Sequence, residues 1–208
     1  RHYDEHFPLK QVGINLWAAV EYLLFGEGRS GLVIGEDGWL YSDEEFAPVA
    51  DAQRQMQDNL ALIRGVQQRL EQHDVHLLLA IVPAKTRLYP EHTGRHHPSA
   101  LQRSLYPHFH RAVRDAGIAA PDLLGPLQAG KSQAPMFLRT DTHWTPDGAE
   151  VTARALSEVV RSAVPLRGEP QEFITETVET RAHRGDLTSF LPLAPLFENL
   201  LPSADSLQ

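Results

Sequence analysis

Cysteine is absent from the 208 residues of this chain. The absence excludes a disulfide framework, a thiolate zinc site and a cysteine nucleophile, and it leaves the redox compartment open. The chain also lacks any apolar run near the roughly 20 residues that span a bilayer, and no signal peptide is visible. Internal repeats and low-complexity segments do not occur either. The length suits one large domain or a domain with an appendage, and 42% hydrophobic residues are enough to build a core; we predict a single domain over residues 1–208.

Positive charge is scarce in this sequence. Lys and Arg number 19 against 27 Asp and Glu, which gives a formal net charge of −8. Nucleic acid and anionic membranes both favour a basic surface, so this balance argues against either as a partner.

Histidine is concentrated between residues 92 and 110, and the cluster raises the question of a metal site. Its members are His92, His96, His97, His108 and His110. Carboxylates are sparse around them and cysteine is absent, so the pattern favours a solvated, His-rich loop over a set of metal ligands. We therefore predict neither a metal nor a cofactor.

Helical and strand patterns alternate along the chain. Residues 1–30 predict a lead-in helix, and residues 31–200 predict an α/β core that opens with a hairpin around Asp37-Gly38. Further helices are predicted over 51–73, 99–117, 121–130 and 146–163, and strands over 75–82, 118–120, 136–138 and, weakly, 168–180. Residues 75–82 are too apolar for a one-sided strand and predict a strand buried on both faces. This alternation of strands and helices predicts an α/β fold. We expect a three-layer α/β/α, flavodoxin-like domain with a central, mostly parallel sheet.

One stretch, residues 139–148, carries the residues of a candidate active site. Asp141 and His143 are two apart, so in an extended segment or tight loop both side chains point to one side. Thr145 followed by Pro146 predicts the N-cap and first position of a helix, which places the pair in the loop before it. An Asp that accepts the Nδ1 proton of a His leaves Nε2 free to take a proton from a hydroxyl. By spacing alone, an Asp that caps its own loop beside an unrelated His is an equally good interpretation.

One further loop and one aromatic ring are candidates for substrate contacts. Residues 83–91 follow the predicted strand 75–82, and ligands collect at the carboxyl ends of parallel strands. Lys85 in this loop is expected to touch a substrate carboxylate or hydroxyl or to organise an oxyanion region; the alternative is a solvated lysine. Trp144 either walls the site and stacks on a sugar or packs beneath the loop.

The sequence Asp141-Thr142-His143-Trp144-Thr145-Pro146-x-Gly148-Ala149 resembles the motif of the alginate O-acetyltransferase family, the AlgJ and AlgX proteins and the cellulose-acetylating WssI proteins, which are relatives of the SGNH hydrolases. The resemblance extends, in patches, over residues 5–200. It includes Phe25-Gly26-Glu27-Gly28, Gly35-x-Asp37-Gly38-Trp39-Leu40, Pro83-x-Lys85, Tyr89-Pro90 and Gly185-Asp186-Leu187.

This resemblance implies an SGNH hydrolase-like fold and catalytic roles for Asp141 and His143, with Lys85, Tyr89 and Trp144 at the substrate. It also implies a nucleophilic Ser in a Gly-x-Ser-[Tyr/Phe] turn, which does not occur here after Gly185-Asp186-Leu187. Ala204-Asp205-Ser206-Leu207 superficially resembles the hydrolase motif, but no apolar strand precedes it, so Ser206 is not assigned. We expect the nucleophile beyond Gln208.

The function that the resemblance implies is O-acetyl transfer to hydroxyls of an exopolysaccharide, alginate or cellulose, by a Ser-His-Asp mechanism. The expected partners are the polysaccharide acceptor and a membrane-bound acetylation protein that passes on the acetyl group. The expected location is the periplasm, and because the chain begins with Arg1 rather than Met, an inner-membrane anchor ahead of it is allowed for. Two alternatives stay open: an acetyl-polysaccharide esterase that delivers the acetyl group to water, and a non-catalytic polysaccharide-binding module.

Overall fold

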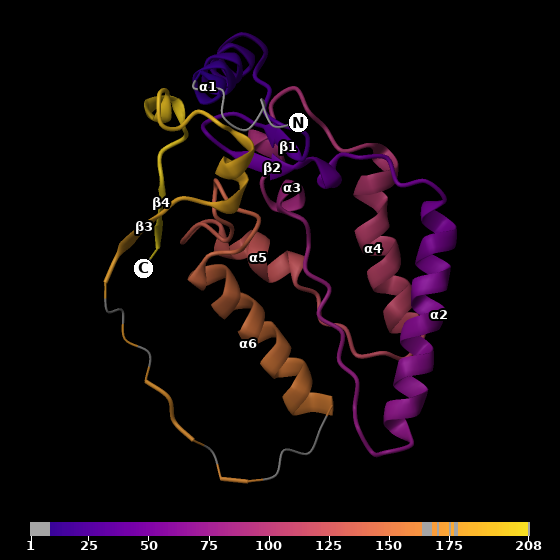
Figure 1. Ribbon diagram of the computed structural model, residues 1–208. Helices are drawn as coiled ribbons and strands as arrows, with labels where there is room; N and C mark the ends of the chain where they lie inside the picture. The colour runs from indigo at the N-terminus through magenta and orange to yellow at the C-terminus, as the bar shows by residue number, and fades with distance from the viewer. Residues whose placement is uncertain (1–8, 164–167, 170, 175, 177–178, 208) are drawn as a thin grey trace.

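The structure, a computed structural model, describes residues 9–163, 168–169, 171–174, 176 and 179–207, which contain helices, two short antiparallel strand pairs and the loops between them (Figure 1). In chain order the elements are α1 (Lys10–Val20), η1 (Glu21–Phe25), β1 (Leu32–Ile34), β2 (Leu40–Ser42), η2 (Asp43–Glu45), α2 (Ala52–Glu71), α3 (Lys85–Leu88), η3 (Pro90–His92), α4 (Ala100–Asp115), α5 (Leu124–Gly130), α6 (Pro146–Ala163), β3 (Arg181–His183), η4 (Asp186–Phe190), η5 (Glu198–Leu200) and β4 (Asp205–Leu207).

The predicted hairpin is confirmed. β1 and β2 pair antiparallel, with Leu32 opposite Ser42 and Ile34 opposite Leu40. Asp37 and Gly38 in the turn both have positive φ, 55° and 76°, which is the conformation that an Asp-Gly turn supplies at low cost.

The long helices also lie where the apolar periodicity predicts them. α4 begins at a capping box, in which the Ser99 hydroxyl accepts from the Gln102 N–H and the Gln102 side chain accepts from the Ser99 N–H. After its last turn Gly117 has φ of 79°, as a glycine that ends a helix often does. α2 and α4 run side by side and form one flank of the molecule (Figure 1).

The central strands differ from the prediction. Over residues 75–82 the chain is extended, but its pairing among the described residues is one parallel bridge, Leu78 with Ala119, in which Leu79 N–H donates to the Ala119 carbonyl at 2.8 Å. Val75 and Val82 are 46% and 44% exposed, so this segment is not buried on both faces. An apolar run indicates that its side chains favour burial. A strand in a sheet also requires a neighbouring strand whose backbone N–H and C=O groups pair with its own. The fold is thus a mixture of helix and sheet in which the described residues form no parallel central sheet.

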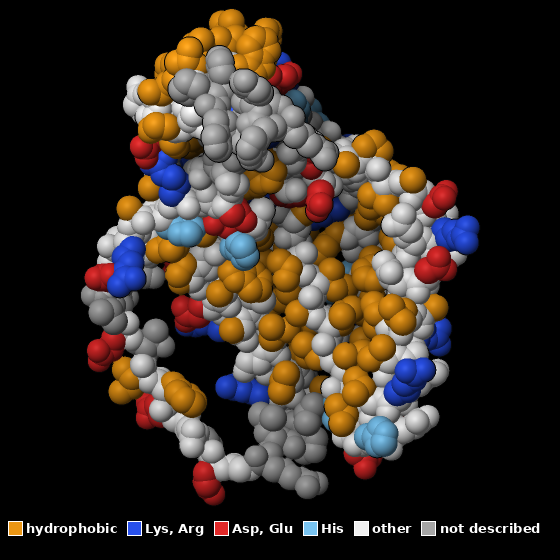
Figure 2. Space-filling model, viewed as in Figure 1, with side chains coloured by type: hydrophobic (Ala, Val, Ile, Leu, Met, Phe, Trp, Pro, Cys, Tyr) orange, Lys and Arg blue, Asp and Glu red, His pale blue; other side chains and the backbone are white. Residues whose placement is uncertain are grey.

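The lead-in helix packs by a different face from the one predicted. Helical periodicity places the apolar residues Leu16, Trp17, Leu23 and Leu24 on a stripe suited to packing on the domain, yet each is more than half exposed, and Figure 2 shows an apolar cap over α1. The buried residues are Asn15, Ala18 and Ala19. Small side chains let the helix approach closely enough for the Asn15 amide to donate to the carbonyls of residues 192 and 194. No helix in the described part of the chain is long and apolar enough to span a membrane.

Residues 179–207 contain a second pair of strands. β3 and β4 pair antiparallel, with His183 opposite Asp205 and Ala182 opposite Ser206. The described residues of the stretch 168–180 contain no strand, so β structure starts later than predicted, and the remaining residues of that stretch lie outside the described part. This strand pair brings the end of the chain beside the loop that carries Asp141 (Figure 1).

Candidate active site

The candidate site is built on a tight reversal of the chain between residues 137 and 144. Phe137 pairs with Trp144 in an antiparallel bridge, and Leu138 N–H donates to the His143 carbonyl at 3.0 Å. Met136, Phe137 and Leu138 are buried, each at most 5% exposed. The buried run anchors the loop, in which Thr140 and Asp141 are also buried while Thr142 and His143 are exposed.

The helix that follows is capped as predicted. Thr145 Oγ1 accepts a hydrogen bond from Gly148 N–H at 3.1 Å, and Pro146 is the first residue of α6. Gly148 is required here for space, because a Cβ on it would lie 2.1 Å from the Met136 carbonyl oxygen. The capped first turn of α6 is thereby fixed against the base of the loop.

Asp141 and His143 form the predicted pair. His143 Nδ1 lies 2.6 Å from Asp141 Oδ1, and the His143 backbone N–H donates to the same oxygen at 3.0 Å. A carboxylate only accepts, so Nδ1 carries the proton and Nε2 of the neutral ring is an acceptor. The Asp141 side chain is 6% exposed and the His143 side chain 75%. The pair thus has a buried orienting carboxylate and an imidazole open to an incoming hydroxyl.

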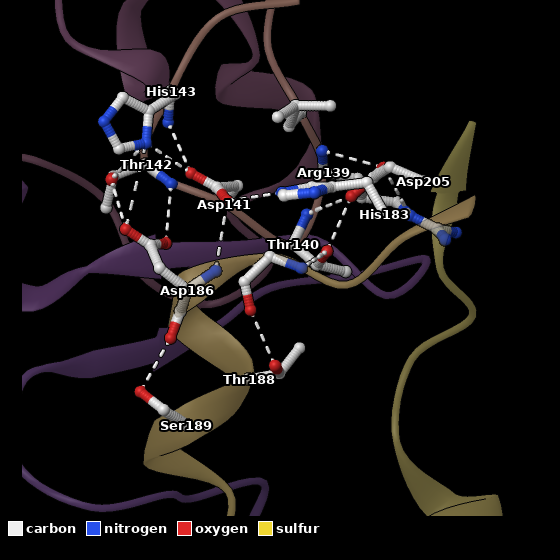
Figure 3. A network of polar contacts seen from close by, with 12 residues as sticks. Arg139, Thr140, Asp141, Thr142, His143, His183, Asp186, Thr188, Ser189 and Asp205 are labelled. Carbon is white, nitrogen blue, oxygen red and sulfur yellow. Dashed lines mark hydrogen bonds and ion pairs between the residues drawn. The ribbon is translucent and has the colours of Figure 1, made fainter. Parts of the chain in front are cut away.

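A second histidine donates a hydrogen bond to the other carboxylate oxygen of Asp141. His183 Nε2 donates to Asp141 Oδ2 at 2.8 Å, and Asp186 N–H donates to it at 3.1 Å (Figure 3). Burial by itself raises the pKa of Asp141, but the hydrogen bonds from His183, His143 and the two backbone groups outweigh it and hold the pKa well below its usual value. Asp141 is therefore a carboxylate with four donors fixed around it.

The same pairing raises the pKa of the His143 imidazole. The hydrogen bond and the charge of Asp141 raise the pKa of His143 above its ordinary value, with a smaller contribution from Asp186. An imidazole with a raised pKa is a stronger base once it is neutral. This suits a residue that must take a proton from a hydroxyl near neutral pH.

Asp186 and Gly185 hold the loop from the other side. The Asp186 carboxylate accepts from Thr142 N–H at 2.9 Å and from the Thr142 hydroxyl at 2.6 Å. Gly185 lies so close that a Cβ there would meet the Thr140 carbonyl oxygen at 2.1 Å. Gly185-Asp186 thus forms a backbone-to-backbone contact that a side chain at position 185 would break.

Asp205 in β4 supports the base of the loop. Its two carboxylate oxygens accept from Arg139 N–H and Thr140 N–H, each at 3.0 Å, and from the Thr140 hydroxyl at 2.6 Å. Ser206, next to it, is exposed and lies opposite Ala182. Asp205, Ser206 and Leu207 of the Ala-Asp-Ser-Leu segment thus form a strand, and Asp205 is the residue that contacts the site.

Lys85 lies underneath the loop. It is 2% exposed, and its ammonium donates to the carbonyls of Leu138, Arg139 and Asp141 at 3.2, 3.3 and 2.8 Å. Burial lowers its pKa to about 8, while the surrounding carboxylates oppose that shift. Lys85 is thus not a solvated lysine, and its three donors are directed at the loop backbone. This geometry favours a positioning role, and its contact with substrate stays a prediction.

Tyr89 and Trp144 occupy packing positions beside the loop. Tyr89 is 6% exposed, its hydroxyl accepts from Met136 N–H at 2.8 Å, and its ring lies 4.2 Å from that of Trp39. Trp144 is half-buried against the same cluster. The structure brings Lys85 and Tyr89 below Asp141 and His143 rather than beside them, so the substrate roles of Tyr89 and Trp144 are untested predictions.

Three residues of this network were not recognised as site residues in the sequence: His183, Asp186 and Asp205. Asp186 belongs to the Gly-Asp-Leu element, which resembles the family motif but has no local pattern that indicates a role at the site. Asp205 lies in the Ala-Asp-Ser-Leu segment, where the motif points to the serine and not to the aspartate. His183 carried no local signal, because it lies 42 residues from the carboxylate that it contacts.

One group of the described residues has side chains spaced as metal ligands could be. It consists of Asp141, His143 and Asp186, whose possible ligand atoms lie within 4.8 Å of one another. Two carboxylates and an imidazole are a plausible set for a divalent cation, but the oxygens of Asp141 are already accepting four hydrogen bonds. The histidines between 92 and 110 form no such group in the described part. The prediction that no metal is used is not tested by this geometry.

The fold and the Asp-His loop define this chain as an SGNH hydrolase-like domain. It belongs to the family described as "SGNH hydrolase-like domain, acetyltransferase AlgX", which matches residues 32–208. The resemblance and the coarser fold assignment are thereby confirmed.

Among similar proteins, the "Probable alginate O-acetylase AlgJ" of Pseudomonas syringae pv. tomato is 58% identical over 207 residues, and that of Azotobacter vinelandii is 55% identical. The match takes in 100% of this chain and 53% of each of these relatives, so the chain spans about half of their length.

Two solved structures resemble the described fold. The O-acetyltransferase domain of Pseudomonas putida AlgJ has a TM-score of 0.80 and 54% identity, over 86% of this chain and 64% of that one. Pseudomonas aeruginosa AlgX has a TM-score of 0.61 over 85% of this chain and 42% of that one; at 20% identity, it supports the fold alone.

Proposed function

We propose that this chain carries the Asp-His part of an O-acetyltransferase that acetylates hydroxyls of an exopolysaccharide. The observation that carries the proposal is the Asp141–His143 pair, with Nδ1 held at 2.6 Å and the ring 75% exposed. The names of the relatives, alginate O-acetylases, support alginate over cellulose as the polymer. The three-layer arrangement with a mostly parallel sheet remains part of this proposal for the whole domain.

The first half-reaction is acetylation of a serine. The serine oxygen attacks the acetyl carbonyl carbon of the donor, and its proton passes to His143 Nε2, while Asp141 holds the ring in the required tautomer. The proton then passes from Nε2 to the leaving group as its bond to the acetyl carbon breaks, which leaves an acetyl-serine. By the resemblance, the serine lies beyond Gln208.

In the second half-reaction a sugar hydroxyl attacks the acetyl-serine. His143 Nε2 takes the hydroxyl proton and returns it to the serine oxygen as the ester bond breaks, so the enzyme is regenerated and the sugar is acetylated. An acetyl donor passed on by a membrane-bound protein, and a periplasmic location, are proposed with this mechanism.

The test is intact-mass measurement after exposure to p-nitrophenyl acetate. Residues 1–208 alone should take up no acetyl group, whereas a form extending past Gln208 should gain one, and His143→Ala in that form should slow the uptake about 10²- to 10⁴-fold. Ser206→Ala is the control. An adduct on residues 1–208 that disappears in Ser206→Ala would show that Ser206 is the nucleophile.

The acceptor decides between transfer and hydrolysis. With an alginate oligosaccharide present, the extended form should move acetyl groups onto sugar hydroxyls. Release of acetate to water at the same rate with and without the oligosaccharide would identify an esterase instead. Saccharide binding without any acetyl chemistry in the extended form would identify a binding module.

A further inference from the structure

Lys85 is the most deeply buried lysine in this chain. It is 2% exposed, and burial lowers its pKa to about 8, so the ammonium form predominates at pH 7. In the part of the chain that the structure describes, no carboxylate lies within ion-pair distance of its Nζ. A buried charge without an ion-pair partner is costly unless other groups surround it. The carboxylates that act on it from farther away are those of Glu45, Asp205, Asp141 and Asp186.

The groups that surround this ammonium are backbone carbonyls of a single loop. Its Nζ donates to the carbonyls of Leu138, Arg139 and Asp141 at 3.2, 3.3 and 2.8 Å. An ammonium has three N–H donors, so each donor has one acceptor. Among the described residues, Lys85 is the one donor to the Leu138 and Asp141 carbonyls, whereas that of Arg139 also accepts from Leu40 N–H at 3.0 Å. The loop therefore depends on this side chain for its hydrogen bonds.

Two aromatic rings hold the ammonium from another direction. Nζ lies over the ring of Tyr41 at 5.0 Å from its centre, and over the ring of Trp39 at 5.6 Å. Both rings are buried, and the Tyr41 hydroxyl donates to the Tyr89 carbonyl at 2.8 Å, which fixes the ring. The face of an aromatic ring attracts a cation. The β1–β2 region thus holds the charge in place beneath the loop.

The arrangement requires a cation and not merely a side chain of this size. A methionine here would fill similar space, but it would leave the carbonyls of Leu138 and Asp141 buried without a donor. Carbonyl oxygens that point at one place also repel one another unless positive charge lies between them. The Asp141 carbonyl and the Asp141 carboxylate belong to the same residue, so a rotation of this backbone would displace the carboxylate from His143 Nδ1, which it holds at 2.6 Å.

We propose that Lys85 is a positioning residue, whose ammonium fixes the backbone of residues 138–141 and thereby keeps the Asp141 carboxylate in place to orient His143. The inference rests on the proposed function of the Asp141–His143 pair, and it gives Lys85 no contact with the reacting atoms. Loss of Lys85 would act on the chemistry through Asp141.

The experiment is NMR titration of His143 in residues 1–208 carrying Lys85→Met, which removes the charge and the donors at nearly equal length. The hydrogen bond from Asp141 is the largest cause of the raised pKa of His143. Its weakening should therefore lower this pKa toward the ordinary value of about 6.5. The low-field resonance of the Nδ1 proton should weaken at the same time.

Lys131→Met is the matched control. The Lys131 ammonium also donates to a backbone carbonyl, that of Leu88, and lies over the Tyr89 ring at 4.3 Å from its centre, but it contacts no residue of the loop 138–141. This variant should leave the His143 titration unchanged. Thermal unfolding of both variants checks that they fold.

Chemical rescue separates the donors of Lys85 from its bulk. Lys85→Ala should show the same fall in the pKa of His143, and added propylammonium, which matches the atoms that are lost, should reverse it. Propanol lacks the charge and tetramethylammonium lacks N–H donors, so neither should reverse it. Rescue by all three compounds, or by none, would overturn the proposal.

Two results in Lys85→Met would also contradict it. An unchanged pKa of His143 together with a lower unfolding temperature would leave Lys85 a purely structural residue, and a rise would show that its charge acts on the imidazole directly. No acetyl group is transferred in these measurements, so a failure of the proposed function would leave the expected results intact. In an active, extended form, kcat should fall about 10²-fold with little change in KM, the cost of a misplaced catalytic group.

Discussion

At the scale of residues, the site is organised around one carboxylate with several donors. Asp141 accepts from two imidazoles and two backbone N–H groups, and these bonds lower its pKa while Asp141 raises that of His143. The two histidines differ in exposure: the His143 side chain is 75% exposed and that of His183 36%. The exposed His143 ring is therefore suited to proton transfer, and the less exposed His183 ring to holding Asp141 in place.

Replacing Asp141 should change the titration of His143. Asp141→Asn removes the negative charge and the acceptor that raise the pKa of His143, so this pKa should fall toward its ordinary value of about 6.5. NMR titration of the imidazole protons in residues 1–208 measures it directly. In an active form, the acid limb of kcat/KM should lie above about pH 6.5 in wild type and move to lower pH in the variant, with a rate lower by up to about 10⁴-fold. An unchanged His143 titration would remove Asp141 from its orienting role.

Replacing His183 should move the same pKa in the opposite direction. In His183→Ala one donor to Asp141 is lost, so more of the carboxylate's charge acts on His143 and the pKa of His143 should rise further. Unfolding in urea should show a loss of about 1 kcal/mol at pH 7. His183→Gln retains an N–H donor and should restore part of both effects, and the exposed His76→Ala is the matched control. A stability loss without a change in the His143 titration would leave His183 a purely structural residue.

At the scale of elements, the loop 138–142 is held by hydrogen bonds from three separate elements. Lys85 at the start of α3 donates to three of its carbonyls, Asp205 of β4 accepts two of its N–H groups, and Asp186 at the start of η4 accepts that of Thr142. α6 then leads away from the site with its first turn capped by Thr145. A loop held at this many points presents its catalytic pair without large rearrangement.

The close contact at the start of α6 gives a paired prediction. Gly→Ala inside a helix ordinarily stabilises by about 0.5–1 kcal/mol, and Gly65→Ala in α2 should do so, because a Cβ there meets nothing within 4 Å. Gly148→Ala should instead destabilise, by about 2 kcal/mol or more, because its Cβ would lie 2.1 Å from the Met136 carbonyl oxygen. Urea unfolding of both variants measures the difference. Equal stabilisation of the two would mean that α6 is not held against the loop.

At the scale of the whole molecule, the long helices form where the sequence predicts them, but the described residues do not form the predicted central sheet. The extended stretch 75–82 is held by a single bridge to Ala119 and by side-chain packing of Leu77, Leu79 and Ile81 against α2 and α4. Its exposed valines show that this face is incompletely covered by the residues described.

Hydrogen exchange tests this arrangement. In residues 1–208 the Leu79 amide, which donates to Ala119, should exchange markedly more slowly than those of Leu78 and Ala80, which have no acceptor among the described residues. Amide exchange followed by NMR resolves the three. Strong protection of all three would show that 75–82 is a strand paired on both edges, as the three-layer, parallel-sheet prediction requires.

The sequence by itself determined the features that depend on neighbours within a few positions. The Asp37-Gly38 turn, the long helices, the Thr145 cap and the Asp141–His143 pairing are all local, and each is set by backbone preference or by side chains two to four residues apart. The family resemblance likewise rests on short motifs, and the match over residues 32–208 confirms it.

Only the tertiary structure decided which distant residues complete the site and which apolar ones are covered. His183 and Asp205 reach the Asp141 loop across 42 and 65 residues, and no periodicity encodes such a contact. Lys85 was predicted on a loop beside a substrate but lies 2% exposed beneath the site, while the apolar stripe of α1 faces outward. The reason is physical: hydropathy states what burial would gain, but packing geometry and the available hydrogen-bond partners decide which groups are buried.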